Sequence, residues 1–127
     1  MDTPAFGLHI ERVDGWIVAE LWGEVDLVAV ERLAVPLAMV AQEPSLGVIV
    51  DLRRVTFMDC CGLSLLCLMR NGALEQGRRL TLVIESPSLH RLLRLAGLAD
   101  VFEIAGSLQA ALGRYANGAE GGQGLSA

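Results

Sequence analysis

The chain has 127 residues, a formal net charge of -5 and a hydrophobic content of 53%. This length and composition are typical of one globular domain with a buried core. All of its basic residues are arginines, and they are scattered along the chain rather than clustered. We therefore expect no nucleic-acid partner, because phosphate binding requires concentrated positive charge.

The apolar residues are interrupted often enough that no run of about 18 of them occurs, so we expect no direct membrane insertion. Residues 1–10 lack the basic and apolar regions of a signal peptide. Three cysteines, two of them adjacent, do not form the even set of a secreted disulfide framework. Together these features predict a cytoplasmic protein.

Two strands are predicted near the start of the chain, at residues 8–13 and 16–21. The Asp14-Gly15 pair between them tolerates positive φ, which a tight hairpin turn requires. The chain is therefore predicted to open with an antiparallel strand pair.

A helix is predicted over residues 28–42, where apolar residues recur at helical spacing. Residues 23–26 form the loop and the helix start before it, with Asp26 as the N-cap. Pro36 lies inside this helix and is expected to kink it, because proline removes a backbone hydrogen bond.

The most informative segment follows a continuous apolar run at residues 46–52, which is typical of a central strand. Residues 57–62 then read Phe-Met-Asp-Cys-Cys-Gly, and a helix is predicted from Leu63 to about Gln76. Asp59 is interpreted as shaping the turn or capping this helix. A carboxylate and two thiols thus stand where a strand gives way to a helix, a place where unpaired backbone N–H groups attract anions.

The remaining elements are a strand at 80–84, a helix begun by Ser86-Pro87 and ended by Gly97, a strand at 101–104, and a helix from Ser107 to about Tyr115. The order is β-β-α-β-α-β-α-β-α, which predicts an α/β fold with an open, mixed sheet of about five strands and about four helices. Residues 1–116 form the predicted domain, and the Gly-rich residues 117–127 a disordered tail.

The chemistry of common enzymes is missing from the sequence. There is no Gly-rich phosphate loop, and His9 and His90 lie in different predicted elements without a partner acid or nucleophile. Cysteines at 60, 61 and 67 without a nearby histidine do not offer the paired ligand spacing that zinc prefers. We therefore expect neither an enzyme nor a metal or cofactor site.

Four landmarks recur in the order and spacing of a known family. They are Gly23-Glu24-Val25-Asp26; Asp51-Leu52 with Phe57-Met58-Asp59-Cys60-Cys61-Gly62-Leu63; Gly77-Arg78-Arg79-Leu80 with Ser86-Pro87-Ser88-Leu89-His90-Arg91-Leu92; and Ala96-Gly97-Leu98. Over residues 8–115 the chain resembles the STAS domain, the family of anti-sigma factor antagonists and sulphate-transporter tails.

The resemblance implies an anti-sigma factor antagonist that binds an anti-sigma factor of the serine-kinase type and so releases a sigma factor. The implied partner-binding residues are Glu24, Asp26, Asp59, Cys60, Cys61, Gly62 and Ser64. In the family the kinase phosphorylates the first serine after the turn aspartate, and the added charge breaks the complex. Here Cys60 holds that position and Cys61 the next, and a thiol does not accept the phosphate. Ser64 is an acceptor only in a shifted register.

Two interpretations of the thiols remain open. In one, Cys60 and Cys61 are small, mostly buried side chains that fit where serine does. In the other they form a redox switch, since a helix N-terminus stabilises a thiolate, although Asp59 opposes that effect. Cys67 is interpreted as a packing residue, too far along the helix from Cys60 for a disulfide.

Two further functions compete with the antagonist. Some STAS domains without the phosphoserine are subunits of phospholipid ABC transport complexes, and copurification with a membrane-bound ATPase would favour that function. The third possibility is a stand-alone redox sensor. The sequence does not indicate whether the domain dimerises.

Overall fold

The structure, a computed structural model, describes residues 5–113. Its elements are β1 (Phe6–Val13), β2 (Trp16–Val25), α1 (Leu27–Gln42), β3 (Gly47–Met58), α2 (Cys60–Glu75), β4 (Arg79–Val83), α3 (Pro87–Leu95) and β5 (Glu103–Ala105). A further helical segment covers residues 108–113. The predicted α/β element order is confirmed. The tail predicted at 117–127 lies outside the described residues.

The five strands form one sheet in the order β1-β2-β3-β4-β5. β1 and β2 are antiparallel, and the later neighbours are parallel. The turn between β1 and β2 has Asp14 and Gly15 at positive φ, 52° and 86°. The hairpin predicted from this residue pair is therefore confirmed, because such turns need positive φ at both central residues.

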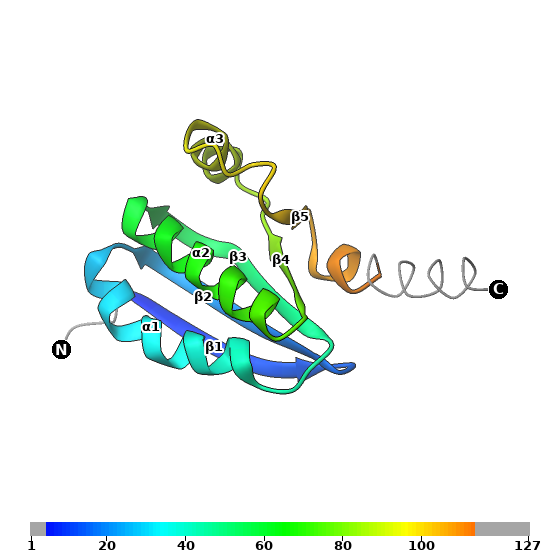
Figure 1. The fold of residues 1–127 in the computed structure, drawn as a ribbon. Coiled ribbons are helices and arrows are strands. Elements are labelled where there is room, and N and C mark those ends of the chain that lie inside the picture. Colours follow the sequence, from blue (N-terminus) through cyan, green and yellow to red (C-terminus); the bar gives the residue numbers. More distant parts are fainter. Residues whose placement is uncertain (1–4, 114–127) are drawn as a thin grey trace.

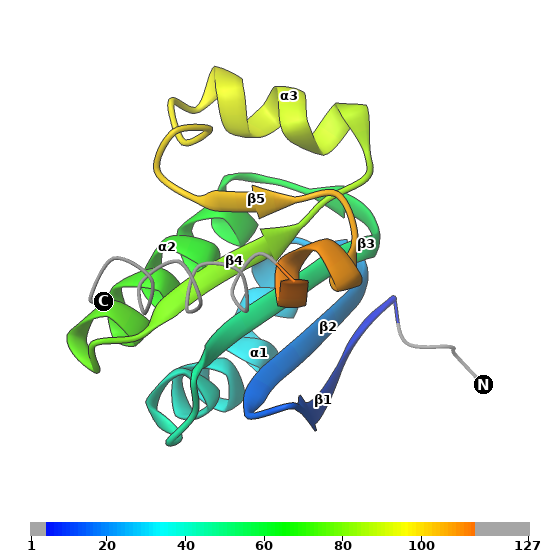
Figure 2. The same ribbon diagram turned by 90° about the vertical axis from the view of Figure 1, so that its right-hand side faces the viewer.

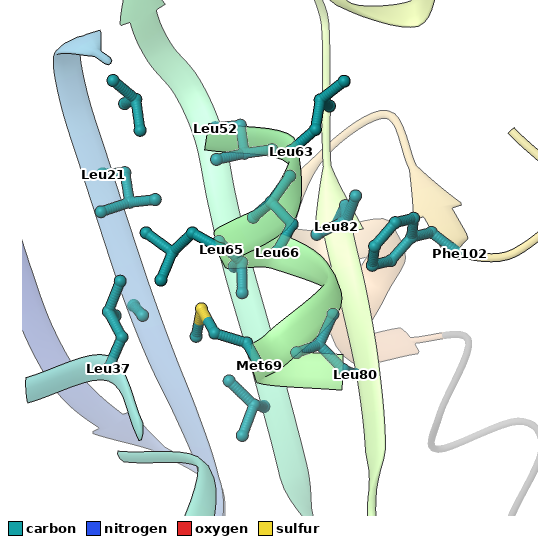
Figure 3. Packing of buried hydrophobic residues seen from close by; sticks show 14 of the residues in the cluster. Leu21, Leu37, Leu52, Leu63, Leu65, Leu66, Met69, Leu80, Leu82 and Phe102 are labelled. Carbon is teal, nitrogen blue, oxygen red and sulfur yellow. The ribbon is translucent and has the colours of Figure 1, made fainter. Parts of the chain in front are cut away.

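The main core lies between the sheet and the helices α1 and α2, which cover one of its faces (Figure 1). Figure 3 shows how Leu21 of β2, Leu37 of α1, Leu52 of β3 and Leu66 and Met69 of α2 meet in this layer. Each of these side chains is almost fully buried. Burial of each contributes about 1.5–3 kcal/mol, so this layer holds the two helices on the sheet.

A second, smaller apolar cluster lies on the opposite face of the sheet. Trp16, Val18, Ile49 and Val83 pack there against the segment at residues 108–113. Figure 2 shows this segment crossing the sheet in front, with α1 and α2 behind, while α3 lies beside β5 at one edge. Ser107 accepts a hydrogen bond from the Ala110 N–H at 3.0 Å, which confirms its predicted role as a cap.

The carboxyl ends of the parallel strands β2 to β5 lie along the same side of the sheet. This carboxyl-terminal edge, distinct from the lateral edge at β5, carries the predicted site. Val25, the last residue of β2, lies opposite Met58, the last residue of β3. A single residue separates the end of each strand from the start of the helix that follows it: Asp26 before α1 and Asp59 before α2. The first turns of the two helices are therefore held next to each other.

Both strands at this edge are longer than predicted. Residues 23–25 lie in β2, not in a loop, and β3 continues beyond Leu52 to Met58. The two extensions pair with each other through register shifts around Glu20 to Glu24. Gly23 adopts φ 84°, which a side chain would strain. The pairing partner of each extension comes from a distant part of the chain, so local pattern did not indicate it.

Smaller differences affect the helices and the last strand. α2 begins at Cys60 rather than Leu63, and β5 covers 103–105 rather than 101–104. The helical spacing of apolar residues predicts that Leu74 and Ala96 face inward, but both are exposed. α1 runs without interruption through Pro36, which is exposed, so water can satisfy the carbonyl that the proline leaves unpaired. No helix within residues 5–113 has the length and apolar character to cross a membrane.

Candidate functional site

Asp59 caps the first turn of α2. Its backbone is extended, with φ -113° and ψ -169°, and its Oδ1 accepts the N–H of Cys61 at 2.9 Å and that of Gly62 at 3.2 Å. Two of the N–H groups that a helix start leaves unpaired are thus satisfied by one carboxylate. The sequence-based interpretation of Asp59 as a cap is confirmed.

Gly62 allows the start of α2 to lie against the end of β2. A Cβ added at this glycine would stand 2.8 Å from the carbonyl oxygen of Val25 and 2.6 Å from Cγ of Met58. The Asp59 N–H also donates to the Val25 carbonyl at 3.4 Å. A glycine at this point of the sequence predicts close backbone approach, because it has no Cβ, and the structure confirms it.

Asp26 repeats the same arrangement at the start of α1. Its Oδ1 accepts the N–H of Ala29 at 3.1 Å, which confirms the predicted N-cap. Glu24, two residues earlier, is exposed, lies opposite Phe57 in the β2–β3 pairing, and donates its backbone N–H to Ala5 O at 2.8 Å. The structure thus brings the two acidic landmarks of the sequence, at 23–26 and at 57–63, to one edge of the sheet.

The three thiols differ in exposure. Cys60, the first residue of α2, is exposed, while Cys61 and Cys67 are half-buried, and all three are free. The interpretation of both adjacent thiols as mostly buried is wrong for Cys60, because the helix starts at this residue and turns its side chain outward. Cys67 packs against the main core, as predicted.

Cys60 opens onto a shallow hollow of about 440 Å³. Its wall is formed by α2 and by the chain that follows α3. The lining residues are Cys60, Leu63, Ser64, Cys67, Leu68, Ala96 and Leu98. Ser64, one helical turn after Cys60, is exposed here. Sequence reasoning missed Ala96 and Leu98 as neighbours of the thiol, although both belong to the Ala96-Gly97-Leu98 landmark.

Phe57 is a second residue that the sequence did not single out for the site. Half of its surface is exposed at the end of β3. With Met58, Ser86 and Leu89 it lines a pocket of about 230 Å³ between β3 and α3. An exposed aromatic ring next to a capped helix start suits a contact surface, because such surfaces are enriched in aromatic side chains. Its exposure follows from the fold, so the sequence held no signal for it.

Asp51 lies apart from this edge and has a structural role. Its side chain is nearly fully buried and accepts Nε of Arg53 at 2.9 Å and Nη2 at 2.7 Å. The hydrogen bond to the Asp51 carboxylate raises the pKa of Arg53. The strand predicted at residues 46–52 would end just after Asp51, but β3 continues to Met58, so that boundary is wrong.

The two histidines lie on different elements: His9 is exposed on β1, and His90 is half-buried on α3. Within residues 5–113, no three His, Cys, Asp or Glu side chains gather closely enough to hold a metal ion. What this edge offers is a surface of carboxylates, a thiol and a hydroxyl over two adjacent helix starts.

Comparison with known proteins identifies several chains of similar sequence or structure. The chain is 25% identical over 108 residues to BtrV of Bordetella bronchiseptica, which carries the name of an anti-sigma factor antagonist; the match covers 85% of this chain and 93% of BtrV. An anti-sigma factor antagonist from Mycobacterium paratuberculosis has a similar structure, with a TM-score of 0.80, 24% identity, and coverage of 90% of this chain and 97% of that one.

The antagonist SpoIIAA is also similar, and its structure has been solved in an unphosphorylated and a phosphorylated form. The unphosphorylated form matches with a TM-score of 0.74 and 24% identity, covering 87% of this chain and 97% of SpoIIAA. The family model described as the STAS domain matches residues 8–111, which include both capped helix starts. The chain therefore belongs to the STAS domain family.

Proposed function

We propose that this protein is an anti-sigma factor antagonist, a cytoplasmic regulatory binding protein rather than an enzyme. Its partner is an anti-sigma factor of the serine-kinase, ATPase type, and binding releases a sigma factor for transcription. The observation that carries the proposal is the joining of the two acidic landmarks at one sheet edge, where Asp59 N–H meets the Val25 carbonyl. The names of the similar proteins support the same function.

The proposed contact surface consists of Glu24, Asp26, Asp59, Cys60, Cys61, Gly62 and Ser64. Glu24, Cys60 and Ser64 are exposed and available to a partner. Asp26, Asp59 and Gly62 have a positioning role, because they fix the two helix starts that present the exposed residues to the partner. A rigid surface of this kind binds without the entropic cost of ordering loops.

Cys60 stands at the position that the family phosphorylates. It is the first residue after the cap and its side chain is exposed, which suits an acceptor hydroxyl approached by a kinase. A thiol does not take the phosphate, so we propose binding that is free of phosphorylation control. Cys60 and Cys61 then become the candidates for a redox signal in its place.

The direct test is calorimetry of the reduced protein with kinase-type anti-sigma factors from the same genome. We expect binding, and we expect Cys60→Asp to weaken it about tenfold or more, since a new charge in a packed interface is left without a partner. Met39→Asp, at an exposed position near the far end of α1, is the matched control and should bind normally. Absence of binding to every such anti-sigma factor would contradict the proposal, and copurification with a membrane-bound ABC ATPase would then favour the transport-complex subunit.

A second experiment tests the role assigned to Cys60. We expect the kinase and ATP to leave the natural protein unmodified and to transfer phosphate to the Cys60→Ser variant. Phosphate incorporation that is equal in both proteins would place the acceptor elsewhere, with Ser64 as the first residue to map by peptide mass spectrometry.

A further inference from the structure

β1 forms a lateral edge of the sheet, opposite the lateral edge at β5 (Figure 2). Its inner side pairs with β2 along the whole strand, and within residues 5–113 no strand pairs with its outer side. An edge strand presents a row of unpaired N–H and C=O groups that another strand can join. Residues 9–12, in the second half of β1, are exposed. β1 is therefore open to a further strand.

The backbone groups of β1 alternate between β2 and the outer side, and two contacts show which residues point outward. The tight turn at 14–15 makes its flanking residues, Val13 and Trp16, a hydrogen-bonded pair. Ala5 continues the same register and accepts the N–H of Glu24 at 2.8 Å. Odd-numbered residues of β1 thus bond to β2. The outward N–H and C=O groups are those of the even-numbered residues, Phe6, Leu8, Ile10 and Arg12.

The side chains of β1 divide between the two faces of the sheet. Leu8 packs against the main core, and Ile10 lies on the same face with 40% of its surface exposed. His9 and Glu11 lie on the opposite face, and both are exposed. An imidazole donates hydrogen bonds and carries positive charge when protonated, so it complements a carboxylate. The outer half of β1 thus offers one apolar side chain between two complementary polar ones.

We propose that two copies of this chain associate through their β1 strands, which run antiparallel about a two-fold axis at Ile10. In this register Ile10 lies opposite Ile10 of the second copy, and His9 lies opposite Glu11 of the second copy. The outward groups of Leu8 face those of Arg12 of the second copy, as a hydrogen-bonded ladder requires. The two five-stranded sheets become one continuous sheet, and symmetry closes the assembly as a dimer.

Charge complementarity selects this register from its neighbours. Moving one strand by two residues keeps the outward groups matched, but it places His9 opposite His9 or Glu11 opposite Glu11. Like side chains directly opposite each other are unfavourable when charged. In the proposed register the His9–Glu11 pair occurs twice, at positions without backbone hydrogen bonds, where the facing side chains are closest. A move by one residue would oppose an outward residue to one already bonded to β2.

The proposed contact is small, so we expect a reversible dimer. It consists of about six backbone hydrogen bonds, the contact between the two Ile10 side chains and the two His9–Glu11 pairs. Such a contact lies at the low end of protein interface sizes, and we expect a dissociation constant on the order of 0.1 mM. The proposal is independent of the proposed function, because the contact lies on a different edge of the sheet from the two capped helix starts.

The register is tested by exchanging the two complementary side chains. Sedimentation equilibrium of the full chain at about 0.01–1 mM measures the dimer dissociation constant. His9→Glu opposes two carboxylates and Glu11→His two imidazoles, so each single variant should dimerise several-fold more weakly. The double variant restores the unlike pairs and should dimerise like the natural protein. Because residue 9 also lies opposite Glu20 on β2, thermal melting of each variant checks that it is folded.

Two results of that experiment would overturn the proposal. One is natural protein that stays monomeric at the highest concentration. The other is a double variant that dimerises no better than the two single variants, since the unlike pairs would then have no part in the contact.

Amide hydrogen exchange followed by NMR locates the contact without relying on charge. As the protein concentration is raised, the N–H groups of Leu8, Ile10 and Arg12 should exchange more slowly, because they gain partners. Those of His9 and Glu11 already bond to β2 and should not change. Protection that grows on α1 or α2 instead would place the dimer contact elsewhere. Protection of β1 that appears only when a different protein is added would make the occupant a foreign strand, and both results would overturn the proposal.

Ile10→Pro provides a variant that blocks the contact while sparing the fold. It removes an outward N–H and no bond to β2, and proline is tolerated at such edge positions. We expect a folded protein that remains monomeric throughout the concentration range. A folded Ile10→Pro variant that dimerises as strongly as the natural protein would show that β1 is not the contact.

Discussion

α1 and α2 begin at the same sheet edge and by the same device, yet they present different chemistry. Asp26 and Asp59 have nearly the same backbone geometry, with φ of -111° and -113° and ψ of -168° and -169°. Each accepts the N–H of the third helical residue. The caps are therefore structural in both helices, and what distinguishes the two starts is the residues that the caps position.

α1 and α2 differ at their first and third helical residues. At the first position, α1 exposes Leu27 and α2 exposes the thiol of Cys60. At the third position, α1 buries Ala29, whereas α2 has Gly62 pressed against the Val25 carbonyl. α2 is therefore held closer to the neighbouring strand than a side chain at its third position would allow.

The largest effect is expected from changing the third position. Gly62→Ala puts a Cβ about 2.8 Å from a backbone oxygen that cannot move aside cheaply, and we expect a loss of about 1–3 kcal/mol in the free energy of unfolding. An exchange in α1 that removes no buried group, Ala38→Gly at an exposed position, should cost only about 0.5–1 kcal/mol through backbone entropy. Urea unfolding of both variants makes the measurement. Equal losses would mean that the close approach at Gly62 has no special importance.

The second-largest loss of stability is expected from removal of the N-cap side chains. Asp59→Ala deletes two hydrogen bonds and Asp26→Ala one, and loss of an N-cap costs about 0.5–2 kcal/mol. We expect the Asp59 variant near the top of that range and the Asp26 variant lower, both read from urea unfolding. Asn at either position keeps the acceptor oxygen and is the matched control. A larger loss at Asp26 would show that the two caps are not equivalent.

Local chemistry explains which parts of the site the sequence predicts. Asp26 was predicted as a cap because a carboxylate just before a helical pattern acts on N–H groups two or three residues away. Asp59 precedes the predicted helix start at Leu63 by four residues, so it was interpreted as shaping the turn or capping the helix. The Asp14-Gly15 turn was predicted for the same reason, since its φ values depend on the two residues themselves. These features need no information from elsewhere in the chain.

The parts that were missed depend on distant residues. Phe57 lies on a strand extension that exists because β2 pairs with it across register shifts, and no local pattern encodes that pairing. The exposure of Cys60 depends on which residue begins α2. That start is fixed by the hydrogen bond from the Asp59 N–H to the carbonyl of Val25, a residue on another strand. The hollow beside the Cys60 thiol needs Leu98, about forty residues further along the chain. Sequence reasoning therefore identified the residues of the site but not their surroundings.

The smallest effect is expected at the thiols, and it separates structure from function. Cys60→Ala should change the free energy of unfolding by no more than about 0.5 kcal/mol, because the side chain is exposed. Cys61→Ala should cost more, since that side chain is half-buried. Unfolding by urea and calorimetry with the anti-sigma factor are measured on the same preparations.

The expected pattern is that Cys60→Ala is neutral for folding but insensitive to disulfide reagents in the binding assay, whereas Cys61→Ala is less stable and keeps the sensitivity. A destabilised Cys60→Ala variant would show that the thiol packs like the small buried residue that the sequence first suggested. Leu27→Ala, the matching exposed position of α1, should be neutral in stability as well. If Cys60→Ala is as stable as the natural protein but its partner binding still responds to disulfide reagents, the reactive sulfur is that of Cys61. The chemical difference between the starts of α1 and α2 would then lie at the second helical position and not at the first.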